Sequence, residues 1–248
     1  MQYWLESGLL KKAGFVHGFT MRKGGVSQGD FASWNFSSSV GDDDKAVADN
    51  LHLLATRIDT TVGHLHGVHQ VHGHRIVEVL TPEQVTTHEK ADGLLIRASK
   101  TTALVKTADC VPVLVAEQKS GQVAALHAGW RGVQAGIVPK AIERLRELVT
   151  GADCLVAIGP HISAGAFQVG PEVAEVFAPF ATPDPKAEGK FLVSLVDALL
   201  EQLSEVGLGR KHVEVVEGCT LTDDTERFFS YRRSGGRCGR QVGFVQSR

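Results

Sequence analysis

Three segments of this chain place side chains that can bind metal at the ends of short apolar runs. His72 stands just before a glycine, Cys110 separates two such runs, and His127 closes another. Strands that end at the same rim of a sheet can bring together residues that are far apart in the sequence. Zinc accepts one thiolate and two imidazoles and leaves a fourth position for water or substrate. The sequence therefore predicts one zinc-class ion held in GVHQVHGH (67–74), KTADCVPVLV (106–115) and AALHAGWRG (124–132).

The residue types leave other interpretations open. A lone histidine beside an apolar run is more often a hydrogen-bonded structural residue, and a lone cysteine in a strand is more often a small buried apolar side chain. The spacing of the three residues matches no short zinc signature. Cys110 as nucleophile with His127 as base would instead make the protein a cysteine hydrolase. His64 and His66 are predicted to be solvated strand residues and not ligands.

Three turns combine glycine with arginine. Glycine lets the backbone approach a ligand closely, and the guanidinium group is a planar, permanently charged donor suited to phosphate. A plain turn with a surface arginine is the alternative for each. Together, in a chain of net charge −2, they predict an anionic ligand. The turns are TMRKGGVS (20–27), AGWRG (128–132) and FFSYRRSGGR (228–237).

The composition narrows the class of protein. The 248 residues include 26 basic and 28 acidic side chains, so the chain lacks the basic surplus of a non-specific nucleic-acid binder. Four cysteines without CxxC spacing indicate reduced thiols. The start of the chain does not resemble a signal peptide, and no apolar run has the length of a membrane span. We therefore predict a cytoplasmic protein with no membrane partner.

The pattern of apolar residues predicts a mixed α/β or α+β fold. Neither GxGxxG nor GxxxxGK[ST] occurs, which disfavours a doubly wound nucleotide-binding fold. No repeat or linker divides the chain, so residues 1–248 are predicted to form a single domain. Strands are predicted at 15–20, 75–80, 102–106, 111–116, 123–127, 155–158, 213–216 and 242–245, and helices at 136–149, 171–180 and 192–206, with a surface loop at 181–190.

Several longer motifs resemble the YfiH-like family. They are HGFTMRKGGVS, QVHG, TADCVPVL, AALHAGWRG, GPHISAGAFQVG and CT…FFSYRRSGGR, in order from His17 to Arg237. This family is also called the laccase-domain, polyphenol oxidoreductase or peptidoglycan editing factor family. The resemblance implies packed mixed β-sheets flanked by helices, a fold shared with cysteine-dependent toxin deamidases (CNF-like). It also implies that His72, Cys110 and His127 are the metal ligands, with zinc as the usual ion and copper as an alternative.

The family's members are described as purine nucleoside phosphorylases. The resemblance thus implies phosphorolysis of adenosine, inosine and methylthioadenosine, and deamination of adenosine. A purine nucleoside and phosphate are the expected partners, nucleic acid is not, and the expected state is a monomer or weak homodimer. A copper-dependent polyphenol oxidase is the rival function. It would need several copper centres and repeated HxH pairs, of which the chain has only His64 with His66 and His72 with His74.

The implied chemistry assigns roles to further residues. Arg22, Arg131 and Arg232 are expected to bind substrate by holding phosphate, because their fixed charge suits an anion. Asn35 is expected to contact substrate as well. Asp109, next to Cys110, is expected to be catalytic as the acid–base group of deamination, together with Cys110 and His127. The sequence departs from the family pattern at Met21, at Trp34, which precedes Asn35 where a Leu-Asn pair is usual, and at Gln168 and Cys238.

Overall fold

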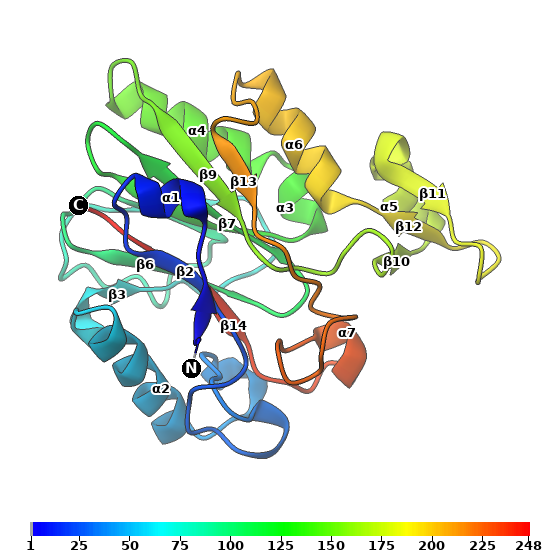
Figure 1. Cartoon of the computed structure of the whole chain (residues 1–248), viewed down its shortest axis with the longest axis horizontal. Helices are drawn as coiled ribbons and strands as arrows, with labels where there is room; N and C mark the ends of the chain where they lie inside the picture. The colour runs from blue at the N-terminus through cyan, green and yellow to red at the C-terminus, as the bar shows by residue number, and fades with distance from the viewer. Residues whose placement is uncertain (1) are drawn as a thin grey trace.

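The structure is a computed structural model that describes residues 2–248 (Figure 1). Its centre is a six-stranded sheet in the order β13-β9-β7-β8-β5-β4. Every residue of β7 and β8 is buried, as expected for apolar strands that are covered on both faces. The strands are β4 (Ile76–Val79), β5 (Gly93–Ile96), β7 (Val111–Glu117), β8 (Val123–Ala128), β9 (Cys154–Ile158) and β13 (Val213–Val215).

A second sheet has five strands in the order β1-β2-β14-β6-β3. The last strand of the chain lies in its middle, antiparallel to both β2 and β6, so the two ends of the chain belong to one sheet (Figure 1). The strands are β1 (Trp4–Leu5), β2 (His17–Thr20), β3 (Leu65–His66), β6 (Thr102–Thr107) and β14 (Gln241–Gln246).

The two sheets pack face to face, and helices cover their outer faces. Phe19 and Val105 of the five-stranded sheet lie in one apolar core with Leu94 and Leu114 of the six-stranded sheet. A second core packs α3, α4 and α6 on the other face of the six-stranded sheet, and a third packs α2 on the five-stranded sheet. The result is a layered arrangement of helices, sheet, sheet and helix. The helices are α1 (Gly8–Lys12), α2 (Asp44–Arg57), α3 (Trp130–Gln134), α4 (Ile137–Leu148), α5 (Pro171–Val176), α6 (Leu195–Glu205) and α7 (Tyr231–Ser234).

A small antiparallel sheet projects from this body (Figure 1). It consists of β10 (Gln168–Val169), β12 (Phe191–Val193) and β11 (Ala181–Pro183). Short 3₁₀ turns span Gly29–Phe31, Ser38–Val40, Val62–His64 and Ala178–Phe180. Among residues 2–248, no helix has the length and apolar character needed to cross a membrane.

The predicted mixed α/β fold with packed sheets flanked by helices is confirmed, and most predicted elements form near their expected bounds. The predicted helix at 192–206 begins only at Leu195, because Phe191–Val193 pairs with β10 and β11. For the same reason the loop expected at 181–190 begins as a strand. His66 is 4% exposed, so the prediction that it is solvated is wrong, while His64 is partly exposed.

Candidate metal centre

His72 is presented by a tight turn between β3 and β4. Its backbone adopts a left-handed conformation with φ of 60°, which is uncommon for a residue other than glycine. The amides of Val71, His72 and Gly73 all donate to the carboxylate of Asp92, over 3.2, 2.8 and 2.6 Å. One buried carboxylate thus holds this turn in place and leaves the His72 ring exposed at the surface of the cluster.

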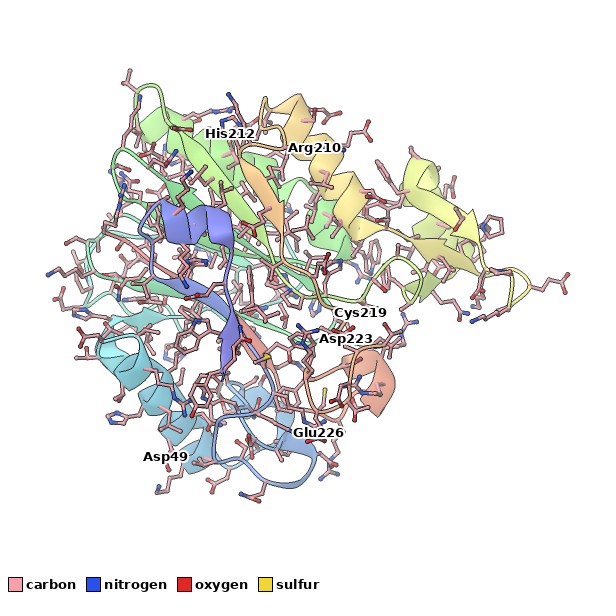
Figure 2. The ribbon with its side chains drawn as sticks, viewed as in Figure 1. Asp49, Arg210, His212, Cys219, Asp223 and Glu226 are labelled. Atoms are coloured by element: carbon pink, nitrogen blue, oxygen red, sulfur yellow. The ribbon has the colours of Figure 1, made fainter. Side chains whose placement is uncertain are left out.

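Cys110 lies directly before β7, in a loop fixed by its neighbour. Asp109 has φ of 87° and a side chain that is 8% exposed. Its carboxylate accepts hydrogen bonds from the Thr220 hydroxyl and from the Arg232 amide, both at 2.6 Å. The segment between β13 and α7, on which Cys219 is labelled in Figure 2, is thereby held against the cysteine loop.

His127 is in β8 opposite Pro112 of β7, and is 3% exposed. Its Nδ1 lies 2.8 Å from Asp92 Oδ1, and its backbone amide donates to the Asp92 carbonyl at 2.7 Å. The His127 ring meets the His72 ring edge to face, with centroids 4.8 Å apart. Asp92 therefore contacts both segments that carry the histidines.

These elements bring the three predicted ligands together. One donor atom from each of His72, Cys110 and His127 lies within 4.8 Å of the other two. A Cβ at Gly129 would stand 3.4 Å from Cys110 Sγ and 3.3 Å from His72 Cδ2, so glycine keeps this side of the cluster open. A thiolate and two imidazoles are a donor set that fits a zinc-class ion.

Burial and mutual charge shape the ionisation of the cluster. Burial acts to raise the pKa of the Cys110 thiol, but the charge of His127 and hydrogen bonds from His127 and His72 outweigh it and lower that pKa to about 6. Burial acts to lower the pKa of His127, but the charge of Cys110 and the bond to Asp92 raise it to about 9. Without a metal, the pair is therefore a thiolate beside an imidazolium at neutral pH.

Of the three arginines predicted to bind an anion, Arg131 keeps its guanidinium N–H groups free. It is exposed, follows Gly129 by two residues and stacks on Trp130 at 4.1 Å; its guanidinium forms no hydrogen bond or ion pair with residues 2–248. The Arg22 guanidinium donates to the carbonyls of Ala32 and Thr225, and that of Arg232 to Gln168. Arg22 and Arg232 therefore have fewer donors to offer an anion.

Two residues with predicted roles have their side-chain polar atoms engaged by the protein itself. Asn35 is 0% exposed: its amide nitrogen donates to Ser37 and Asp42, and its side-chain oxygen accepts from Ser37 and Arg240. It braces a loop and has no atom free for a substrate. Both Asp109 oxygens are engaged, which suits a residue that holds the cysteine loop better than a proton shuttle.

Asp92 belongs to this site, although its sequence context ADGLLI did not mark it as functional. It stands directly before β5 and is 0% exposed. A buried acid at the start of an apolar strand is an unusual placement, because burying an unpaired charge is costly. In the sequence, the signal that could have identified Asp92 is an acidic residue directly before the apolar run of β5.

The protein thus has a mixed α/β fold, in which helices cover the outer faces of two packed sheets. Its His–Cys–His cluster, at the ends of strands, is a candidate mononuclear metal centre. Residues 16–248 match the family described as multi-copper polyphenol oxidoreductase laccase, and the chain belongs to this family. The resemblance to the YfiH-like or laccase-domain family is thus confirmed.

Relatives and solved structures agree with this assignment over nearly the whole chain. A purine nucleoside phosphorylase of Pseudomonas aeruginosa is 36% identical over 240 residues, covering 91% of this chain and 90% of the relative. Purine nucleoside phosphorylase YlmD of Geobacillus stearothermophilus is 32% identical, covering 99% and 94%. The crystal structure of YlmD matches with a TM-score of 0.88 at 31% identity, covering 100% of this chain and 97% of YlmD. The hypothetical protein YfiH of Bacillus licheniformis also gives 0.88, at 26% identity, covering 94% and 93%.

Proposed function

We propose that this protein is a zinc-dependent purine nucleoside phosphorylase acting on adenosine, inosine and methylthioadenosine, and that the same site deaminates adenosine. The observation that carries the proposal is the open His72–Cys110–His127 cluster, in a chain whose relatives of 36% and 32% identity are named purine nucleoside phosphorylases. Zinc is the ion proposed, and copper is the alternative that the donor set also accepts.

When bound, zinc would act as a Lewis acid that polarises an oxygen of the substrate or of water. The chain itself supplies the imidazoles and the thiolate, and Asp92 contacts the two segments that carry the histidines. Gly129 leaves the space beside the three donor atoms into which a ligand can reach.

Phosphorolysis joins a phosphate oxygen to C1′ of the ribose as the bond from C1′ to the purine nitrogen breaks. The purine leaves with the electron pair and takes up a proton, and ribose 1-phosphate is the second product. Positive charge that holds phosphate near C1′ favours this step. Arg131 is the residue we assign to it, because its guanidinium is free and its helix begins directly after Gly129. Arg22 and Arg232 can supply their remaining N–H groups.

One observation favours a second candidate function. The thiol pKa of about 6 at Cys110 and the pKa of about 9 at His127 describe the activated pair of a cysteine hydrolase. A bound metal removes this possibility, since a ligated thiolate is not free to attack. Oxidation by several coppers is less well supported, because residues 2–248 contain one group of three or more side chains that could hold a metal.

The proposal is tested by incubating the purified protein with adenosine, with and without phosphate, and separating the products. We expect adenine and ribose 1-phosphate only when phosphate is present, and inosine in both reactions. Free ribose released equally fast without phosphate would show a hydrolase, and the proposal would be wrong.

A further inference from the structure

Asp92 is a buried carboxylate whose hydrogen bonds all lead to the metal-ligand segments. Its side chain is 0% exposed and forms no ion pair with a lysine or arginine among residues 2–248. Oδ1 accepts from the amide of His72 and lies 2.8 Å from Nδ1 of His127, while Oδ2 accepts from the amides of Val71 and Gly73. Four donors thus converge on one side chain, and two of them belong to proposed ligands.

The contact with His127 fixes which ring nitrogen is available. An ionised carboxylate can only accept, so the imidazole must carry a proton on Nδ1 to bond with Asp92. Nε2 faces the cluster, and once the imidazolium releases its Nε2 proton this nitrogen can offer a lone pair to an ion. Carboxylate–histidine–metal arrangements in other proteins set the tautomer in the same way.

The contacts with residues 71–73 fix the backbone that carries His72. Three successive amides surround Oδ1 and Oδ2 and form a concave anion site in the main chain. These hydrogen bonds hold His72 at φ of 60°, a backbone conformation that is strained for residues other than glycine. Without the carboxylate, this turn would relax and the imidazole of His72 would move away from Cys110.

We propose that Asp92 is the positioning residue of the metal centre: one carboxylate selects the tautomer of His127 and holds the turn of His72, so that both imidazoles are in place before the ion binds. This inference rests on the metal centre of the proposed function. It makes zinc affinity depend on a side chain that does not touch the ion.

The variant Asp92→Asn tests this with little change of volume. Whichever way the new amide is turned, its NH₂ group faces donors: the amides of Val71 and Gly73, or the amide of His72 together with His127. In the second orientation His127 must accept at Nδ1, which places its proton on Nε2 and blocks the metal. We expect zinc to bind about 10- to 100-fold more weakly, as measured by competition with a chromophoric chelator.

Glu117 offers a matched control at the far end of β7. It is also 0% exposed, and its carboxylate accepts from the amides of Lys119, Ser120 and Asp153. Glu117→Gln should lower stability and leave zinc affinity unchanged. Amide hydrogen exchange of the metal-free proteins gives a second readout: Asp92→Asn should speed exchange at residues 71–73, whereas Glu117→Gln should not.

Each outcome bears on the inference. Equal zinc affinity of wild type and Asp92→Asn would overturn it and leave the proposed function standing, whereas a wild type that binds no zinc would overturn both. If Asp92→Asn does not fold, zinc affinity is measured on Asp92→Ala in formate and in chloride. Tighter binding in formate, which can fill the vacated carboxylate position, supports the inference; equal binding, or a second failure to fold, assigns Asp92 to the fold alone and overturns it.

Discussion

At the scale of single residues, Arg131 is the side chain whose replacement separates the two proposed reactions. Arg131→Lys keeps the charge and loses the two-pronged geometry that suits phosphate. We expect phosphorolysis to fall by about one to two decades, equivalent to roughly 1.5–3 kcal/mol, with a smaller change in deamination. The measurement is a pair of initial rates, phosphate-dependent base release and inosine formation, on one preparation.

His127→Ala is the control for that experiment, because it removes a ligand that both reactions share and should damage both. Equal losses of the two rates in Arg131→Lys would show that Arg131 serves the nucleoside or the fold, and the phosphate assignment would be mistaken.

The ionisation of Cys110 gives a second prediction. In metal-free protein the thiol pKa of about 6 means that the thiolate dominates at pH 7, whereas the pKa of Cys154, raised by burial to about 12, keeps that thiol protonated. Cys110 is also partly exposed, whereas Cys154, Cys219 and Cys238 are buried. Iodoacetamide should therefore modify Cys110 first, with a rate that rises as pH increases through about 6. Zinc should protect Cys110. Modification of Cys110 at the same rate with and without zinc would argue against its role as a ligand.

The candidate site could be predicted from the sequence only in part. Histidine and cysteine side chains bind metals where they converge. The residue types of His72, Cys110 and His127 therefore predicted the cluster that the structure contains. Asp92 has no such signature, because a carboxylate that orients other groups is recognised only once its partners are known. Asn35 has the polarity of a binding residue, and only the fold shows that its atoms are already engaged.

At the scale of elements, α1 is held by a carboxylate from a distant strand. Glu214 of β13 accepts from the amides of Gly8 and Leu9 and from the Ser7 hydroxyl, at 3.1, 2.7 and 2.7 Å. Burial acts to raise the pKa of Glu214, but these hydrogen bonds outweigh it and lower that pKa below its usual value. Glu214→Gln should lower the free energy of unfolding by about 1 kcal/mol at pH 7.

The sign of the pH dependence follows from the lowered pKa. A carboxyl group with a lower pKa in the folded state stabilises the protein above its unfolded value, near 4.3, and this contribution is lost as the pH falls through the folded value. The stability gap between wild type and Glu214→Gln should therefore be constant from pH 6 to 7 and close below about pH 4. Urea unfolding at each pH measures it, and a gap that widened in acid would contradict the assignment.

Elements with a continuous apolar pattern were the easiest to predict. β7 and β8 are buried throughout, and α4 places its apolar residues at helical spacing with Pro139 in its first turn. Helix α2 was not predicted, because many of its side chains are polar and its apolar face is narrow. The start of α6 depends on β12 pairing with β10 and β11, which local sequence does not encode.

At the scale of the whole molecule, stability depends on the core between the two sheets. Leu114 lies in this core, is 0% exposed and pairs with Ala125 of β8. Leu114→Ala should cost about 2–5 kcal/mol of unfolding free energy, because it removes apolar contacts and leaves a cavity. Since Leu114 does not belong to the ligand cluster, zinc affinity should be unchanged. A large loss of zinc affinity with little loss of stability would contradict the assignment of Leu114 to the core alone.

Three expectations about the molecule as a whole stay predictions: one domain over residues 1–248, a monomer or weak homodimer, and a cytoplasmic location. Sedimentation of the purified protein over a range of concentrations would decide between a monomer and a weak homodimer.

The proposed function makes the His–Cys–His cluster a zinc centre on which nucleoside phosphorolysis depends. The most direct measurement is the rate of ribose 1-phosphate formation from inosine and phosphate as zinc is added stepwise to metal-free protein, with zinc content determined in the same samples. We predict that the rate rises in proportion to bound zinc and reaches its limit at about one ion per chain, and that Cys110→Ala neither binds zinc nor turns over substrate. Full activity in the metal-free protein, or in Cys110→Ala, would show that phosphorolysis does not depend on this cluster.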